Sequence, residues 1–252
     1  MMELQVIGTG SSGNCYVLRA GGANGQALLL DAGLPLAKIV KSVRGWRSVV
    51  GCLITHEHQD HAKAAVEIER CGIPVFATQG TIDAIRKDSR LTRFNTVSTL
   101  SAYEAGNYTI MAFDAQHDAA EPCGWLIRYE LTGETALYAT DTYYLRHTFP
   151  GVNYWIVECN YIESVMQEQM DAGKLAEPLR GRLIKSHMSL RRLCDALNAN
   201  DLSETRAIVL VHLSDERSDE ATMVETVKDI AGIDDVWAAE AGKTYKLEMT
   251  PF

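Results

Sequence analysis

Several apolar segments of this chain end at an ionisable side chain, and this feature constrains the fold more than any other in the sequence. The segments are short and rich in leucine, isoleucine and valine, which is typical of buried β-strands. The residues that close them are Asp31, His56, Asp141, Glu158 and His212. Because the loops that leave strand ends in an α/β sheet converge on one crevice, we expect these side chains to share a site.

Helical periodicity alternates with the strand pattern along the chain. Strands are predicted at residues 4–8, 27–31, 49–55, 108–113, 136–141, 155–159 and 208–212. Helices are predicted at residues 62–71, 82–87, 190–198 and 221–230. This mixture predicts a layered α/β architecture but not the pairing of the strands. No repeat, low-complexity tract or linker divides the sequence, so we expect a single domain over residues 1–252.

The composition excludes a disordered or membrane-embedded chain. Its 252 residues, 46% of them hydrophobic, are enough to bury a sizeable core. The N-terminus has neither the basic segment nor the apolar stretch of a signal peptide, so we expect a cytoplasmic protein with no membrane partner. The six cysteines are scattered without a C-x-x-C pair, which predicts reduced and mostly buried thiols. The oligomeric state stays open.

Residues 55–61, Thr-His-Glu-His-Gln-Asp-His, hold three imidazoles and two carboxylates between a predicted strand and a predicted helix. A solvent-facing loop has no need for such a density of donors. In an extended backbone His56 and His58 point the same way and can share one metal, while Asp60 and His61 are carried round to a second. Neutral imidazole and carboxylate are ligands of Zn²⁺, Mn²⁺ or Fe²⁺. The segment therefore predicts two adjacent metal ions.

The pattern His-x-His-x-Asp-His at 56–61 resembles the signature of the metallo-β-lactamase superfamily, and the resemblance extends along nearly the whole chain. It implies an α/β fold, the four-layer αββα sandwich, and two divalent metal ions, Zn²⁺ or Mn²⁺. The implied metal ligands are His56, His58, Asp60, His61, His117, Asp141 and His212. Within this set His117 completes the first site, His212 completes the second, and Asp141 bridges both. Asp31 matches the aspartate that supports the histidine segment from behind.

Other segments resemble the small bacterial YycJ-like exonuclease subfamily. They are the glycine-rich opening at 8–14, His117-Asp118-Ala119, Glu158-Cys159-Asn160, Ser186-His187-Met188-Ser189 and His212-Leu213-Ser214. We expect Ser12 and Asn14 of the opening segment to contact substrate, although a tight turn would also use these glycines. The chain departs from the subfamily at Ser186, Met188 and Leu190 and at Asp215-Glu216, which leaves substrate size and the polarity of attack open.

Glu158 and His187 add a carboxylate and an imidazole beyond the implied ligand set. Their order resembles the extra motifs of β-CASP nucleases such as RNase J, which implies that Glu158 supports His187 against the scissile phosphate. Alternatively, His187 has only a structural position, directly before a helix that Ser189 caps. This role and the contact with phosphate are compatible. Only 29 positions separate the two residues, so the lid domain of β-CASP enzymes has no room and we expect an open site.

These features predict phosphodiester hydrolysis, with a 5′-to-3′ exonuclease on DNA or RNA as the leading hypothesis. Asp60 would orient the attacking water, and His187, steered by Glu158, would neutralise charge on the phosphate or leaving oxygen. Arg191 and Arg192 are predicted substrate contacts within a basic stretch at 180–192 that would draw in the strand. The net charge of −9 argues against binding by counterion release alone, and a solvated basic face is the alternative interpretation.

Three other functions stay open. A small-molecule phosphodiesterase of the phosphoribosyl cyclic phosphate type would use the same ligands. Acyl or thioester hydrolysis is a further enzymatic alternative, because the fold does not fix the substrate. A nucleic-acid-binding or regulatory protein with a vestigial metal site is the non-enzymatic alternative, which the complete ligand set disfavours.

Overall fold

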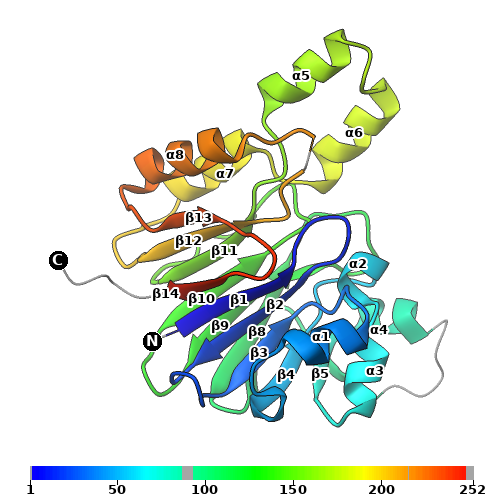
Figure 1. Ribbon diagram of the computed structural model, residues 1–252, viewed down its shortest axis with the longest axis vertical. Coiled ribbons are helices and arrows are strands. Elements are labelled where there is room, and N and C mark those ends of the chain that lie inside the picture. The colour runs from blue at the N-terminus through cyan, green and yellow to red at the C-terminus, as the bar shows by residue number, and fades with distance from the viewer. Residues whose placement is uncertain (1, 87–92, 215, 248–252) are drawn as a thin grey trace.

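The structure is a computed structural model that describes residues 2–86, 93–214 and 216–247. In these residues two seven-stranded sheets stack face to face, with helices on both outer sides (Figure 1). The first sheet runs β14 (Thr244–Leu247), β1 (Met2–Gly8), β2 (Cys15–Ala20), β3 (Ala27–Leu30), β4 (Val49–Leu53), β5 (Val75–Thr78) and β6 (Asn95–Val97). The second runs β13 (Val236–Ala238), β12 (Ala207–Val211), β11 (Tyr154–Glu158), β10 (Thr135–Ala139), β9 (Cys123–Tyr129), β8 (Tyr108–Asp114) and β7 (Ala102–Ala105). The predicted four-layer α/β sandwich is confirmed.

Three hydrophobic clusters account for the layers. The central cluster lies between the sheets and includes Tyr16, Trp125 and Ile156, all fully buried. A second cluster covers the outer face of the first sheet beneath α1 (Leu36–Ser42), α2 (Gln59–Ala62), α3 (Ala65–Arg70) and α4 (Gln79–Arg86). The third packs α7 (Leu190–Asn198) and α8 (Glu220–Ala231) on the second sheet. Apolar burial on both faces of each sheet explains why many strands read as continuous apolar runs.

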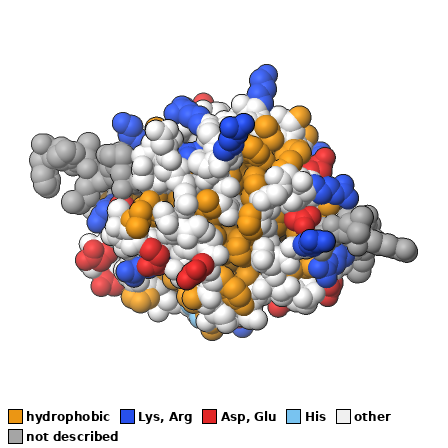
Figure 2. Space-filling model, turned by 90° about the horizontal axis from the view of Figure 1, so that it is seen from below, with side chains coloured by type: hydrophobic (Ala, Val, Ile, Leu, Met, Phe, Trp, Pro, Cys, Tyr) orange, Lys and Arg blue, Asp and Glu red, His pale blue; other side chains and the backbone are white. Residues whose placement is uncertain are grey.

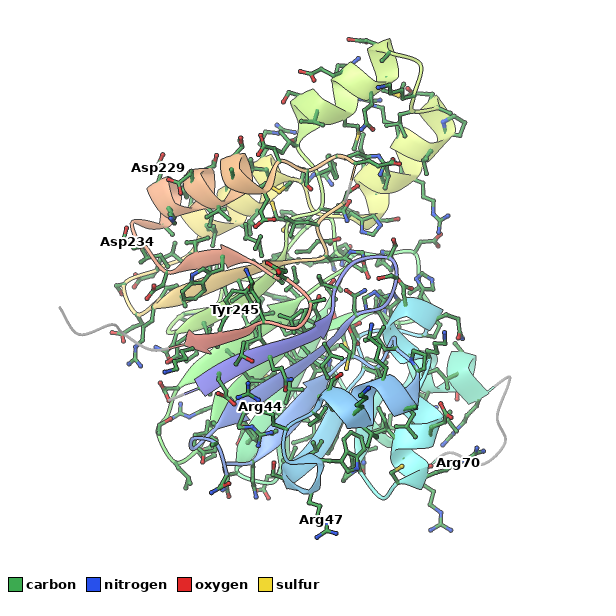
Figure 3. The ribbon with its side chains drawn as sticks, viewed as in Figure 1. Arg44, Arg47, Arg70, Asp229, Asp234 and Tyr245 are labelled. Atoms are coloured by element: carbon green, nitrogen blue, oxygen red, sulfur yellow. The ribbon has the colours of Figure 1, made fainter. Side chains whose placement is uncertain are left out.

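The two sheets are also joined at their upper edges, where β13 and β14 meet. The ring of Tyr245 in β14 packs on Trp237 in β13 with 5.5 Å between ring centroids, and its hydroxyl donates to the carbonyl of Ala238 at 2.7 Å. Figure 3 labels Tyr245 at this junction. The bond gives the edge strand β13 a partner across the sandwich.

α5 (Glu163–Asp171) and α6 (Glu177–Ser186) project beyond the sheets as a pair in Figure 1. These two helices lie in the segment between Glu158 and His187, which is too short to hold the lid domain of β-CASP nucleases. Among the described residues, none of the helices has the length and apolarity required to cross a membrane.

The predicted strands are all present, and the predicted helices are found with one division. The helix predicted at 62–71 is divided between α2 and α3, and the end of the one predicted at 82–87, Lys87, lies outside the described residues. Sequence patterns missed α1, α5, α6 and the strands β2, β5, β6, β7, β9, β13 and β14. Several missed strands have only three or four residues, too few for a periodic signal. As predicted, most cysteines are buried, with Cys71 exposed, and all are free thiols.

Backbone geometry marks the strand ends that carry ionisable residues. Asp31, Asp141 and His212 follow β3, β10 and β12 directly or within two residues, with φ of 58°, 49° and 55°. Non-glycine residues rarely adopt this left-handed conformation, and they keep it where the surrounding structure enforces it. Each therefore turns the chain sharply out of its sheet at the same end of the sandwich.

Close packing fixes the histidine segment against the loop after β3. The backbone N–H of Asn14 donates to the carbonyl of Asp60 at 2.7 Å, and Gly33 donates to the carbonyl of Asn14 at 2.9 Å. A Cβ on Gly33 would lie 1.7 Å from the Asp60 carbonyl oxygen. Gly33 is therefore required by contact with the histidine segment.

We expect Gly33→Ala to lower the free energy of unfolding by about 1–3 kcal/mol, because the added methyl group forces the backbone of Asp60 to move. Gly181→Ala is the matched control, since a Cβ at Gly181 in α6 meets nothing within 4 Å. It should raise stability by about 0.5–1 kcal/mol through helix propensity. Chemical denaturation measures both, and equal stability of the two variants would contradict the packing of Gly33.

Candidate metal centre

The three imidazoles of His56, His58 and His117 converge at one end of the sandwich. Nε2 of His56 lies 3.0 Å from Nδ1 of His58, and Nε2 of His117 lies 3.2 Å from the same atom. His56 and His58 come from the loop between β4 and α2, and His117 from the loop between β8 and β9. Three ring nitrogens in mutual contact cannot all pair with one another, since a neutral imidazole has a single N–H.

A second group of donors lies beside the first. Nε2 of His61 is 2.5 Å from Oδ2 of Asp141 and 3.5 Å from Oδ2 of Asp60. His212 completes this group, with donor atoms of Asp60, His61 and His212 all within 4.8 Å of one another. Asp141 also belongs to a group with His56 and His61, and so lies between the two sets. The predicted ligands therefore come together as two sets that share one carboxylate.

The hydrogen bonds of the remote ring nitrogens orient the imidazoles toward the centre. Nδ1 of His117 donates to the carbonyl of Ser186 at 3.0 Å, and Nδ1 of His61 donates to Asp31 at 2.8 Å. The Thr55 hydroxyl donates to Asp31 and so accepts from Nδ1 of His56, at 3.0 Å. These bonds place a proton on Nδ1 of each ring, so that Nε2 is the nitrogen that faces the centre.

This donor set fits divalent transition metals. Nε2 of His212 is buried and has no hydrogen-bond partner, although a buried acceptor ordinarily has one. Burial lowers the pKa of His56 well below 6.5 and also lowers that of His117, so both rings favour the neutral form that binds metal. Nitrogen and carboxylate donors without a thiolate match the chemistry of Zn²⁺ or Mn²⁺.

Asp31 joins the histidine segment to the opposite sheet. Its carboxylate is fully buried and accepts from the Thr55 backbone at 2.8 Å, from His61, and from the Tyr138 hydroxyl at 2.6 Å. Tyr138 belongs to β10 of the second sheet, whereas Thr55 follows β4 of the first. Asp31 thus has the orienting contacts that its predicted supporting role requires.

Glu158 holds two imidazoles with a single oxygen. Its Oε1 accepts from Nδ1 of His187 at 2.7 Å and from Nδ1 of His212 at 2.9 Å. Its Oε2 accepts from the backbone N–H groups of Thr142 and Met188, at 3.1 Å and 3.2 Å. Sequence patterns predicted only the contact with His187. The contact with His212 depends on the pairing of β11 with β12, which brings Glu158 opposite Val211.

His187 lies at the end of α6, where its side chain is 18% exposed. Burial alone would lower its pKa, but the carboxylates of Glu158 and Asp141 raise it to about 10. The helix-boundary interpretation of this segment agrees with the geometry, because Ser189 caps α7 by accepting from the backbone N–H of Arg192 at 3.3 Å. The contact of His187 with a scissile phosphate stays a prediction. His187 therefore combines a position at a helix boundary with a charged ring beside the predicted ligands.

A groove of three adjoining hollows passes over the donor groups. The central hollow, about 230 Å³, is lined by His58, Asp60, His117, Asp141 and His187 together with Leu179, Arg182, Leu183 and Ser186. The serine arm, about 490 Å³, is lined mainly by residues 9–12, Asn160 and residues 212–214. The tyrosine arm, about 450 Å³, is lined by residues 115–118, Pro122, Tyr143, Arg182, Lys185 and Ser186. Each arm shares lining residues with the central hollow, so the groove extends to both sides of it.

The structure corrects the predicted substrate contact at Asn14. Ser12 lines the serine arm as expected, but Asn14 is fully buried. Its amide lies 3.0 Å from Nε2 of His61, and its Oδ1 accepts from the Gly10 backbone at 2.9 Å. Asn14 therefore positions His61 and the opening loop. At residues 215–216 the sequence departs from the YycJ-like subfamily. Of these two residues, Glu216 lines the serine arm and Asp215 lies outside the described residues.

The predicted contacts at Arg191 and Arg192 stay predictions, although neither side chain is among the residues that line the three hollows of the groove. Arg191 is 74% exposed and pairs with Glu163 at 3.3 Å. Arg192 donates to the carbonyls of Ile184 and Tyr143, at 2.7 Å and 3.3 Å. The break between α6 and α7 separates the basic stretch into two surfaces, which sequence spacing alone did not predict.

Positive charge reaches the groove from α6. Arg182 and Lys185 line it, and in the described part of the chain neither makes an ion pair or a side-chain hydrogen bond. On the underside of the molecule both signs of charge are interspersed around a band of hydrophobic side chains (Figure 2). The labelled Arg44, Arg47 and Arg70 lie low on the first-sheet side (Figure 3). The free cations beside the donor groups are thus a local feature of α6.

The sandwich and its donor groups define a metal-dependent hydrolase. The family model described as the beta-lactamase superfamily domain matches residues 27–213, and the chain belongs to this family. It is similar to the exodeoxyribonuclease WalJ of Streptococcus pneumoniae, with 26% identity over 233 residues, 86% of this chain and 83% of the relative. It is likewise similar to the exodeoxyribonuclease YycJ of Bacillus anthracis, with 27% identity over 231 residues, 84% of this chain and 83% of the relative.

Solved structures agree on the fold. The metallo-β-lactamase fold protein YhfI from Bacillus subtilis superposes with a TM-score of 0.71 at 18% identity, covering 97% of this chain and 98% of that one. The short form of human tRNase Z gives a TM-score of 0.63 at 15% identity, covering 98% of this chain and 100% of that one. The predicted superfamily resemblance is confirmed.

We expect Glu158→Gln to weaken binding of the second metal ion by about 10–100-fold, because His212 loses the carboxylate that orients it. His187→Ala should leave the metal content unchanged, since the seven predicted ligands complete two sites without His187. Elemental analysis after dialysis measures both variants. His147→Ala is the control, because His147 lines a separate hollow beside α7. Metal loss in His187→Ala would make His187 a ligand.

Proposed function

We propose that the chain is a dinuclear metal-dependent phosphodiester hydrolase that acts as a 5′-to-3′ exonuclease on DNA or RNA. The observation that carries the proposal is the groove, which continues on both sides of the donor groups and has the free cations Arg182 and Lys185 on its wall. A small cyclic phosphodiester would occupy the central hollow alone, whereas a chain of nucleotides would use the arms as well. The similarity to two exodeoxyribonucleases supports the same substrate class.

The predicted metal ligands would hold two ions, Zn²⁺ or Mn²⁺. His56, His58 and His117 would hold the first, Asp60, His61 and His212 the second, and Asp141 both. When bound, the ions supply Lewis-acid stabilisation of phosphate charge and lower the pKa of a water molecule. The protein's part is to fix these donors from behind, through Asp31, Thr55, Ser186 and Glu158.

Asp60 and His187 line the groove, where Asp60 would orient the attacking water and His187 would donate a proton. Burial tends to raise the pKa of Asp60, but the hydrogen bond from His61 lowers it overall, so Asp60 is ionised and can orient the attacking water. His187 carries a proton under the influence of Glu158 and lines both the central hollow and the serine arm. It would neutralise charge on the phosphate or protonate the leaving oxygen.

One assay tests the proposal. Metal-loaded protein is incubated with 5′-labelled linear DNA and RNA, with internally labelled circular DNA and RNA, and with a cyclic phosphodiester and a thioester. Release of mononucleotides from linear strands, with circular strands untouched, is the expected result. Cleavage of the cyclic phosphodiester alone would replace the proposal with the phosphoribosyl-type activity, and cleavage of the thioester alone would replace it with acyl hydrolysis.

We expect removal of the two free cations to weaken polynucleotide binding and flatten its salt dependence. In Arg182→Ala/Lys185→Ala the slope of log affinity against log salt should fall by about 0.7 for each phosphate of a single strand that is no longer neutralised. Arg180→Ala/Arg191→Ala is a control of equal charge change, because these arginines pair with Glu177 and Glu163. Binding titrations at several salt concentrations measure the slopes. Equal slopes for the two double variants would exclude Arg182 and Lys185 as the phosphate-binding residues.

We expect His187→Ala to lower kcat by about 10²–10⁴ while the Tm is retained, the usual contribution of a positioned acid. If His187 protonates the leaving oxygen, a substrate with a better leaving group should recover much of the missing rate. Steady-state kinetics on two leaving groups measure this recovery. Full activity of the variant would reduce His187 to a residue at a helix boundary.

A further inference from the structure

Tyr143 lies in the loop that carries Asp141 and is hydrogen-bonded to the loop that carries His117, two of the segments that contain predicted ligands. It follows Asp141 by two residues, and its backbone N–H donates to the carbonyl of Gln116 at 3.2 Å, directly before His117. Thr142 strengthens this link, because its hydroxyl accepts from the Gln116 backbone at 2.8 Å and donates to the carbonyl of Tyr144 at 2.9 Å. The position of Tyr143 is thus set by the same backbone that sets the donor groups.

Arg192 supports the ring of Tyr143 from outside the groove. Its guanidinium carbon lies 5.1 Å from the ring centroid, and its Nη1 donates to the carbonyls of Tyr143 and Ile184. Tyr143 lines the tyrosine arm, whereas Arg192 lines the separate hollow beside α7. A cation held over an aromatic face fixes the ring orientation before any ligand binds.

The lining of the tyrosine arm combines an aromatic ring with unpaired cations. Arg182 and Lys185 come from α6, Tyr143 from the loop after β10, and Gln116 contributes an amide. Proteins that bind single-stranded nucleic acid use this combination, with cations along the backbone and aromatic rings stacked on bases. A base inside a duplex has both faces covered, so only an unpaired base can meet such a ring.

We propose that Tyr143 is a base-stacking residue, and that the tyrosine arm takes one unpaired nucleobase next to a phosphate held by Arg182 and Lys185. The inference rests on the proposed polynucleotide substrate and deepens it to a single-stranded segment at this arm. Arg192 then serves as a positioning residue for Tyr143. The neighbouring Tyr144 is 53% exposed and lines the separate hollow beside α7, so it is the matched control.

The test uses metal-loaded protein and single-stranded phosphorothioate oligonucleotides with 2-aminopurine at successive positions, because stacking quenches its fluorescence. The wild type should quench one position strongly. Tyr143→Leu should abolish that quenching and weaken binding by about 5- to 100-fold, within the range measured for single stacking residues. Tyr143→Phe should retain both properties, and Tyr144→Leu should behave as the wild type.

An abasic oligonucleotide separates stacking from a structural effect. Removal of the quenched base should weaken wild-type binding by the same factor as Tyr143→Leu, and the two changes together should weaken it no further. The inference would be overturned if the two changes weakened binding additively, or if Tyr143→Leu bound and quenched the oligonucleotide as the wild type does. In either case continued cleavage of polynucleotides would leave the proposed function intact. If the wild type neither binds nor cleaves any polynucleotide, the proposed function itself fails.

Discussion

The buried carboxylate of Asp31 is the interaction on which the site depends. It accepts hydrogen bonds from Thr55 and His61 of the first sheet's loop and from Tyr138 of the second sheet. A carboxylate removed from water is stable only when donors of this kind surround it. Loss of one donor would therefore disturb the orientation of a metal-facing imidazole and the joint between the sheets together. Stability of the sandwich and geometry of the site are coupled at this residue.

Glu158 has the corresponding place on the second sheet. It too is fully buried at a strand end, and its oxygens accept from His187, His212 and two backbone N–H groups. The buried carboxyl of Asp141 lies between these partners, and the charges of His212 and His61 keep its pKa well below 3.8 against the effect of burial. So much buried negative charge requires positive charge beside it. A divalent ion meets that requirement while the imidazoles stay neutral.

Part of the predicted donor set follows from local patterns, because Asp141 and His212 close apolar segments and residues 56–61 form one short segment, whereas His117 was implied only by the superfamily resemblance. The seven strands with strong apolar runs were predicted for the same reason. The second role of Glu158 could not be predicted, since it depends on the neighbouring position of β11 and β12. The short edge strands and the burial of Asn14 also result from tertiary packing. Likewise, adjacent basic residues in sequence face different sides once α6 and α7 diverge.

Helix α6 of the α5–α6 pair forms part of the wall of the groove over the donor groups. The pair occupies the stretch between Glu158 and His187, and Arg182, Leu183 and Lys185 of α6 form part of the groove wall. Arg182 and Lys185 are three residues apart, so they share one helix face. Their charges can change without disturbing the buried network of Asp31 and Glu158, because neither side chain participates in it. The predicted metal ligands and the two cations of the groove wall therefore belong to separate parts of the molecule, the first to strand ends and the loops that follow them and the second to helix α6.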